Sequence, residues 1–266
     1  MSVVAPEGAV DLVLSGPDLL FEVARIDRRQ DGSLYAWMPT GTSVTAGGRP
    51  QVAGLGVLVD DVLGYAVNDM AGGWSVSTEL SVDVTGPLPS TGGITCVGRV
   101  VHADELGALA TGEVSTADGR VVARCVLRGR FRDEQPRSEA KRPERQIELA
   151  PLDRTDIDTV LGYAANGAPP RLALTVTERL TNPMGNLHGG IHFCLVERAA
   201  ARAAPALKST ASVRLQLVRG APQGTNLMVT AKVSHLGRTQ AVVEIQTRDE
   251  LGKLYNTATV VRHASA

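Results

Sequence analysis

Apolar and polar residues alternate through three consecutive runs near the middle of the chain and through three more near its end. The first set reads TCVGRVV, ALATGEVST and RVVARCVLR, and the second reads LMVTAKVS, AVVEIQT and LYNTATVV. A period of two places one face of a strand on the core and the other in water. Each set therefore predicts a meander of half-buried antiparallel strands.

The two sets are copies of one pattern. The segments that start at Val84 and Leu217 align without a gap through all three runs. Equivalent residues are 133 positions apart, as in Pro89 and Pro222, Val100 and Val233, His102 and His235, and Gly119 and Gly252. A match at one fixed separation indicates an internal duplication. The equivalent histidines are interpreted as structural residues on strands.

One helical stretch precedes each meander. Over residues 52–70 the apolar residues recur at spacings of three and four, which predicts an amphipathic helix. Residues 189–204 are apolar nearly all round, which predicts a buried helix. A strand-like run precedes each of them, at residues 33–39 and 171–180. Each copy is thus expected to be a strand, a long helix and a meander.

A charged segment with two prolines, DEQPRSEAKRPERQ at residues 133–146, has the composition of a linker between the copies. A short helix is expected soon after it, in PLDRTDIDTVLGYAAN, with Asp153 or Thr155 as its N-cap. We therefore expect two halves, residues 1–132 and residues 147–266. Each half is an α+β unit in which one antiparallel sheet covers a central helix.

The composition is that of a globular protein with a real core, since 43% of the residues are hydrophobic and 21% are charged. A net charge of −1, scattered basic residues and 3% aromatic residues argue against a nucleic-acid partner. No apolar run approaches the ~20 residues of a membrane span, and the first residues lack the basic start of a signal peptide. Cys96, Cys125 and Cys194 are interpreted as buried thiols in a reducing compartment. We expect a cytoplasmic protein with no membrane partner.

The segment TNPMGNLHGGIHFCLVERAA, from Thr181, indicates a chemistry. Asn182 and His188-Gly189-Gly190 stand just before the buried helix, and Glu197 follows the histidine by nine positions. Glycines at a helix start let a ligand approach the first N–H groups, which have no intrahelical acceptor. Those donors, together with the helix dipole, suit a polarised carbonyl or a developing oxyanion.

This motif resembles the hotdog acyl-CoA thioesterases of the phenylacetyl-CoA and 4-hydroxybenzoyl-CoA type. The matching residues are Asn182, His188, Gly189, Gly190 and Glu197, with Ser212 at the family's polar strand position. The resemblance implies that the Asn side chain and the Gly amide polarise a thioester carbonyl. It also implies that an acid on the helix activates water or attacks directly. For the fold it implies a double hotdog, with two antiparallel sheets each wrapped around a long central helix, as in a hotdog dimer.

Helix geometry restricts which acid serves these donors. Gly189 and Glu197 are eight residues apart, or about 12 Å along one helix axis, so they cannot both touch one carbonyl carbon. The acid must come from a second helix packed antiparallel to the first. Alignment of the two helices places Asp60 opposite Glu197, with Asp61 beside it. Ser77 and Thr78 then take the position of the polar strand residue and are assigned to substrate binding, as are Asp61, Gly190 and Ser212.

The duplication predicts two unequal sites. One joins Asn182, His188 and Gly189 to Asp60 and is favoured as catalytic. The other joins Glu197 and Ser212 to TAGGRPQVAGLG, which lacks the motif and has Gln51 where the histidine would stand. Simpler interpretations stay open: Glu197 pairs with Arg198 or Arg202 on its own helix, and Asp60 and Asp61 form a structural pair of which one faces solvent.

The alternatives are a non-catalytic acyl-CoA-binding or scaffold protein and a hotdog enoyl-CoA hydratase, whose Asp-x-Asn-x-x-His loop is not present at Asn182. His188 and His192 lie one turn apart, but the sequence offers no Glu of a His-Glu-x-x-His motif and no evident third ligand, so no metal is expected. No cofactor is expected either. The expected partners are an acyl-CoA or acyl-carrier thioester and further copies of the chain in a homo-oligomer.

Overall fold

The computed structural model describes residues 8–10, 15–23, 25–41, 44–132, 156–166 and 171–264. The predicted linker at 133–146 lies outside these residues, as do the candidate caps Asp153 and Thr155. The short helix they were expected to start has Asp156 as its N-cap instead, because the Asp156 carboxylate accepts the N–H of Thr159. None of the helices in the described ranges is long and apolar enough to cross a bilayer.

The first half follows the predicted order of strand, helix and meander, with a short helix and small strands before it. The long helix α2 covers Leu55–Ala71 and is preceded by a 3-10 turn, η2 (Val52–Gly54), so that together they cover the predicted 52–70 and extend one residue beyond it. The other elements are β1 (Gly8–Ala9), α1 (Gly16–Phe21), β2 (Ile26–Arg28), β3 (Leu34–Pro39), β4 (Thr45–Ala46), β5 (Arg49–Pro50), β6 (Ser75–Val84), β7 (Gly93–Ala103), β8 (Gly107–Thr116) and β9 (Val121–Phe131).

The second half repeats this order. Its long helix α4 covers Gly189–Ala203, as predicted, and the run at 171–180 divides into β11 (Arg171–Thr175) and a 3-10 turn, η3 (Glu178–Leu180). The other elements are α3 (Ile157–Leu161), β10 (Ala164–Asn166), β12 (Ser209–Leu217), β13 (Asn226–Leu236), β14 (Gln240–Asp249) and β15 (Leu254–His263).

The predicted duplication is confirmed down to the irregularities of the strands. The register shift between β6 and β9 falls at Ser77/Glu79, and the one between β12 and β15 falls at Thr210/Ser212. The shift between β7 and β8 at Val100/His102 likewise reappears between β13 and β14 at Val233/His235. All of these are 133 positions apart. A β-bulge re-aims the side chains beside it, so the two copies inherit the same local geometry.

The two half-sheets are joined, and the expectation of two separate sheets was wrong. In the described residues one sheet of 13 strands runs in the order β1-β2-β3-β7-β8-β9-β6-β12-β15-β14-β13-β11-β10. Its centre is the antiparallel pair β6–β12, whose register is symmetric about Ser81 and Arg214, themselves equivalent positions. Each half alone would leave a long edge strand with unpaired backbone groups, and pairing the two edges removes both.

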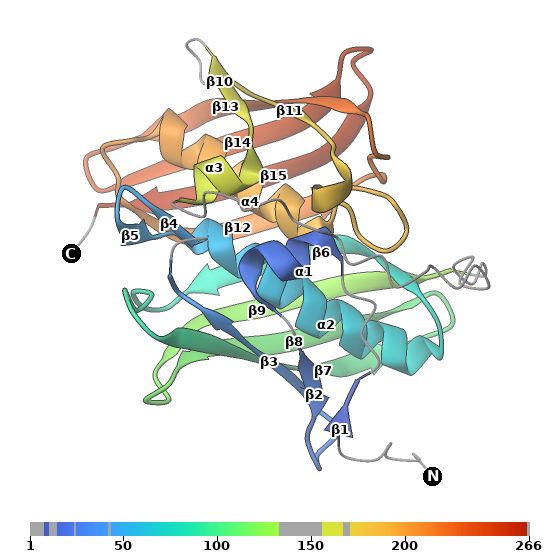
Figure 1. Cartoon of the computed structure of the whole chain (residues 1–266). Helices are drawn as coiled ribbons and strands as arrows, with labels where there is room; N and C mark the ends of the chain where they lie inside the picture. The colour runs from blue at the N-terminus through green and yellow to red at the C-terminus, as the bar shows by residue number, and fades with distance from the viewer. Residues whose placement is uncertain are drawn as a thin grey trace.

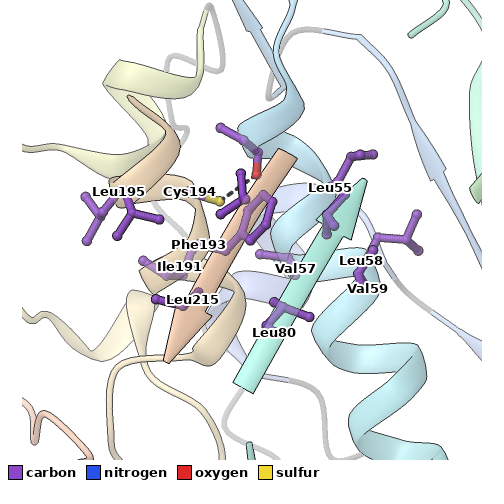
Figure 2. Close-up of a cluster of buried hydrophobic side chains, with 14 of the residues drawn as sticks. Leu55, Val57, Leu58, Val59, Leu80, Ile191, Phe193, Cys194, Leu195 and Leu215 are labelled. Carbon is purple, nitrogen blue, oxygen red and sulfur yellow. Dashed lines mark hydrogen bonds between the residues drawn. The ribbon is translucent and has the colours of Figure 1, made fainter. Parts of the chain in front are cut away.

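The helices α2 and α4 pack against each other on one side of the sheet, between the blue-green half and the orange-red half (Figure 1). Over the central strands β6 and β12, Phe193 and Val57 lie between the helices, above the cross-strand pair Leu80 and Leu215 (Figure 2). The Cys194 thiol donates to the carbonyl of Ala53 at 3.0 Å. All of these side chains are buried, so the junction of the halves is part of one apolar core.

The helices touch backbone to backbone at two glycines. A Cβ on Gly190 would lie 2.5 Å from the Cα of Val57, and one on Gly56 would lie 2.4 Å from the Gly190 carbonyl. Such distances are shorter than any real Cβ contact, so these glycines set how closely the helices approach. This close approach brings residues of α2 to the start of α4.

Gly190→Ala is therefore expected to lower the free energy of unfolding by about 1–3 kcal/mol or more, as overpacking does. Gly64→Ala is the matched control, since Gly64 is inside α2 and a Cβ there meets nothing within 4 Å. Alanine is the better helix former by about 1 kcal/mol, so Gly64→Ala should stabilise. Urea unfolding of both variants measures the difference. Equal effects of the two substitutions would show that the helices are not in close contact.

Candidate active site

The antiparallel helices place Asp60 of the first half against the start of α4 in the second half. Its Oδ2 accepts the N–H of Gly190 at 3.0 Å, and its Oδ1 accepts the Ser77 hydroxyl at 2.8 Å. Asp60 is 8% exposed, so these donors replace most of its contact with water. The predicted pairing of Asp60 with the His-Gly-Gly segment is thus present in the structure. The strand residue that contacts Asp60 is Ser77, as expected.

His188 is the N-cap of α4 and links the two acids of α2. Its Nε2 lies 3.0 Å from Asp61 Oδ1, and its Nδ1 lies 3.3 Å from Asp60 Oδ2 and 3.1 Å from the Gly190 nitrogen. Burial lowers the pKa of His188, but the charge and hydrogen bond of Asp61 and the charge of Asp60 outweigh it and raise the pKa to about 10. In the neutral ring Nδ1 accepts the Gly190 N–H as the helix cap and Nε2 donates to Asp61, whereas the imidazolium donates to both carboxylates.

Gly189, the first residue of α4, is the closest backbone to Asp60. A Cβ at this position would lie 2.6 Å from Asp60 Oδ2, so only glycine fits here without displacing the carboxylate. Within the described residues its N–H makes no hydrogen bond. This donor is available to a ligand and points from a helix N-terminus, where the dipole favours negative charge.

Asn182 supplies a second donor group to the same place. Its Oδ1 accepts the N–H groups of Met184 and Asn186, both at 3.1 Å, which fixes the amide orientation because only the oxygen can accept. The amide NH2 makes no hydrogen bond within the part of the chain that the structure describes. Asn182 and Gly189 both line the same cavity.

That cavity has a volume of about 470 Å³ and is lined by both halves. The first half contributes Asp60, Asp61, Ser77 and Thr78, and the second half contributes residues 182–184 and 186–189, with Leu217–Gly220. The Thr78 hydroxyl donates to the Arg128 carbonyl at 3.0 Å and is turned away from Asp60. Three arginines, Arg130, Arg132 and Arg219, form an exposed part of the lining.

Glu197 occupies the pseudo-symmetric position but is closed off by an arginine. Its Oε1 accepts the Thr210 hydroxyl at 2.5 Å and lies 3.0 Å from Nη1 of Arg262. Its nearest basic partner is Arg262; of the helix neighbours that the sequence offered, Arg198 forms a longer ion pair with Oε2 at 3.9 Å. Glu197 is 1% exposed and does not line the cavity. The structure does not bring it to the motif donors.

The polar strand residue of the second half is Thr210, not the expected Ser212. Thr210 is the counterpart of Ser77, just before the equivalent bulge, whereas Ser212 is the counterpart of Glu79. Across the ladder, Thr210 pairs with Arg262 and Ser77 pairs with Gly129. Gly129 thus stands where the second half has Arg262, and no guanidinium reaches Asp60 from that position.

Sequence analysis did not single out Asp18, which lies beside Asp61 and His188 from the short helix α1. Asp18 is 4% exposed and lines the cavity, and its Oδ2 accepts the Ser15 N–H at 2.5 Å. Burial and then the charge of Asp61 raise its pKa well above the usual value. A signal was present in the segment Ser15-Gly-Pro-Asp18, which has the spacing of a capping box with an early proline.

One group of side chains has the spacing of metal ligands. Single atoms of Asp18, Asp61 and His188 lie within 4.8 Å of one another. In the neutral ring Nδ1 accepts the Gly190 N–H and Nε2 donates to Asp61; in the imidazolium both nitrogens donate. Neither form leaves a ring nitrogen for a metal. His192 is also engaged, 2.8 Å from the Asn256 amide, and its burial lowers its pKa to about 3.

Comparisons with known proteins agree with this architecture. Residues 184–255 match the family described as Thioesterase superfamily, and residues 15–126 match the one described as Acyl-CoA thioesterase C-terminal domain. Together the two matches span more than half of the chain. The chain is a tandem hotdog protein, and it belongs to the thioesterase superfamily.

Individual relatives are more distant. A Deinococcus radiodurans protein named "Putative esterase" is 36% identical over 94 residues, which are 34% of this chain and 64% of that protein, less than two thirds of its length. The structure of the tesB protein of Mycobacterium avium subs paratuberculosis has a TM-score of 0.64 and 7% identity, over 95% of this chain and 100% of that one. An acyl-ACP thioesterase from Bacteroides thetaiotaomicron has a TM-score of 0.57 and 12% identity, over 87% and 98%. The last two show the fold.

Proposed function

We propose that this chain hydrolyses acyl-CoA thioesters at the composite site between its halves. One observation carries the proposal: the Asp60 carboxylate of the first half lies against the backbone donors that open α4 of the second half. A carboxylate and a preorganised set of N–H donors are the two elements that acyl transfer to water requires. Membership of the thioesterase superfamily supports this reaction class.

In the proposed reaction the thioester oxygen accepts hydrogen bonds from the Gly189 N–H and the Asn182 amide. Asp60 removes a proton from a water that attacks the carbonyl carbon, or attacks that carbon itself to form an acyl-Asp60 anhydride that water then hydrolyses. In both cases the carbon–sulfur bond breaks, the leaving thiolate takes up the proton that came from water, and the acyl group is released as the acid with the Asp60 carboxylate restored. Ser77 and the Gly190 N–H hold the carboxylate in place. The hydrogen bonds from these donors become stronger as the oxygen becomes negative. Because they stabilise the transition state more than the bound substrate, they accelerate the reaction. The reaction needs no cofactor.

The arginines of the cavity lining favour CoA as the carrier of the acyl group. Arg130 and Arg132 belong to the first half and Arg219 to the second, so exposed cations stand on both sides of the cavity. The nucleotide part of CoA carries several phosphate charges, and guanidinium groups bind phosphate with paired hydrogen bonds. An acyl chain attached to N-acetylcysteamine has no such charges and provides the comparison.

Charge reversal at Arg130 and Arg219 together should raise the KM for acyl-CoA about tenfold or more, for which a loss of ~1.4 kcal/mol suffices. The KM for the matching acyl-N-acetylcysteamine thioester should stay the same. Arg124→Glu is the control, because Arg124 pairs with Glu113 at 2.7 Å and does not line the cavity. An equal change in KM for both substrates would exclude phosphate binding at these arginines.

The proposed function is tested by measuring thiol release from acyl-CoA thioesters of graded chain length with a thiol-reactive dye. Release that depends on enzyme concentration and is specific to some acyl groups is expected. If the protein binds CoA thioesters but releases no thiol from any of them, it is a binding protein. Hydration of an enoyl-CoA without thiol release would assign the site to the hydratase reaction instead.

A further inference from the structure

Four titratable side chains are buried together at the base of the cavity. They are Asp18 from α1, Asp60 and Asp61 from α2, and His188 at the start of α4, with exposures of 4%, 8%, 5% and 6%. Three carboxylates and one imidazolium would carry a net charge of −2 in a site with little water. Charge of that size is costly to bury unless something neutralises it.

The hydrogen bonds account for most of the oxygens in this cluster but leave two. Both oxygens of Asp60 have donors, Asp61 Oδ1 contacts His188, and Asp18 Oδ2 accepts the Ser15 N–H. Asp18 Oδ1 and Asp61 Oδ2 are buried and have no hydrogen-bond partner. Because two ionised carboxylates are acceptors only, they cannot bond to each other unless one carries a proton.

The second half shows what occupies the equivalent place there. Aligned on their left-handed C-caps, Glu22 and Gly162, the short helices α1 and α3 make Asp158 the counterpart of Asp18. Asp158 forms two hydrogen bonds with Arg198, at 2.7 and 3.0 Å, and Arg198 follows Glu197 as Asp61 follows Asp60. In the second half an acid of the short helix thus meets a cation of the long helix.

In the first half the same position brings acid to acid. We propose that Asp18 is a positioning residue that keeps its proton and donates it to Asp61. Asp61 then holds His188, and His188 holds Asp60. This inference rests on the proposed function only for its effect on catalysis. In the first half the proton removes the charge of Asp18 and bonds it to Asp61. In the second half the guanidinium of Arg198 neutralises and bonds Asp158.

The surroundings assign the proton to Asp18. Asp61 has the His188 ring on its other oxygen, which stabilises its negative charge, whereas the other oxygen of Asp18 meets only a neutral amide. Burial and the charge of Asp61 raise the pKa of Asp18 well above its usual value. The neighbouring Cys96 and His192 stay neutral, because burial raises the pKa of the thiol to about 12 and lowers that of the imidazole to about 3.

Asp18→Asn tests the proposal, because an amide is a neutral donor of the same shape as a protonated acid. We expect kcat within about threefold of the wild type at neutral pH, since the positioning bond is kept. Asp18→Ala removes the donor and should lower kcat about tenfold or more with little change in KM, but by no more than the roughly 10²–10⁴-fold that the positioned base itself contributes. Equal losses in both variants, or no loss in either, would overturn the role of Asp18.

A second readout needs no turnover and so separates this inference from the proposed function. A carboxyl with a raised folded pKa makes the folded state less stable as the pH rises above its unfolded value of 3.8. The Tm of Asp18→Asn minus that of the wild type should therefore increase between pH 4.5 and 8.5. A difference that stays constant across this range would show that Asp18 is ionised in the fold.

Asp158→Asn is the matched control with the opposite sign. Burial raises the pKa of Asp158, but the hydrogen bonds to Arg198 outweigh burial and lower it. The ionised Asp158 side chain therefore contributes to stability at neutral pH, and this contribution is lost in acid. The Tm of this variant minus that of the wild type should become more negative as the pH rises through the acid range below about 5, and should stay level from there to pH 8.5. A remaining alternative is a metal between Asp18 and Asp61. One equivalent of Mg²⁺, Mn²⁺ or Zn²⁺ bound in calorimetry by the wild type and lost in Asp18→Asn would overturn the shared proton.

Discussion

Asp60→Asn is expected to lower kcat for acyl-CoA hydrolysis by about 10²–10⁴-fold, the contribution of a positioned acid–base or nucleophilic group. The substitution keeps the shape of the side chain: its carbonyl oxygen can accept the Gly190 N–H, and its NH2 group can donate to the Ser77 hydroxyl oxygen. It removes the negative charge that attacks or takes up a proton. KM should change little, because the donors for the thioester oxygen remain. Steady-state thiol release measures both constants.

Glu197→Gln provides the control at the pseudo-symmetric position. Glu197 is bound to Arg262 and Thr210, away from the motif donors, so its loss should leave kcat per folded molecule within a few-fold of the wild type. The variant is expected to unfold at lower temperature, which circular dichroism records independently of activity. If Glu197→Gln lost as much activity as Asp60→Asn, the second site would be catalytic and the assignment to Asp60 would be wrong.

The pairing of Asp60 with the start of α4 could be predicted because two regularities coincide. The 133-residue repeat fixes the strands, and the 1.5 Å rise of a helix excludes an acid on the same helix as the donors. Both follow from the sequence alone and do not depend on how distant segments pack against each other. Ser77 followed from the same alignment, since it precedes the bulge at which β6 shifts register.

Other parts of the site depend on contacts between distant segments and could not be predicted. The capping box of α1 identifies a short helix, but nothing local says that Asp18 docks beside Asp61, 43 positions later in the chain. The sequence placed the polar strand residue at Ser212, whereas the structure has Thr210 there, because the bulge between these residues shifts the strand by one residue and so reverses the face that each side chain occupies. The contact between Glu197 and Arg262 likewise joins a helix to the last strand of the sheet.

The two halves have diverged mainly in charge. The site around Asp60 has Asp61, His188 and Gly129, and the site around Glu197 has Arg198, Gln51 and Arg262 at the equivalent positions. Arg198 donates to the Gln51 side chain at 2.9 Å, so even the degenerate helix start is tied to a guanidinium. The first arrangement leaves a carboxylate facing a cavity, and the second buries one in an ion network. Under the proposed function, one of the two equivalent sites acts on substrate and the other is part of the core.

Arg262→Met is expected to lower the free energy of unfolding by about 3–5 kcal/mol, the cost of leaving a buried charge without its partner. Arg262 is 4% exposed at its side chain, and it bonds Glu197, Thr210 and the Leu207 carbonyl, the last with two nitrogens at 3.0 and 2.8 Å. The second oxygen of Glu197 already has no hydrogen-bond partner. Without the guanidinium, Glu197 must take up a proton or admit water, and either lowers stability.

The double variant Glu197→Leu with Arg262→Met separates the loss of stability caused by an unpaired buried charge from the loss caused by poorer packing. A well-packed apolar pair can replace a buried ion pair with little loss, so most of the stability should return in urea unfolding. Arg124→Met is the exposed comparison: its ion pair with Glu113 is shorter, at 2.7 Å against 3.0 Å, but the side chains are 65% and 47% exposed. Solvent screens that pair, and its loss should cost no more than about 1 kcal/mol. Similar losses for Arg262→Met and Arg124→Met would mean that the second site is open to water, and a carboxylate in water could act on substrate.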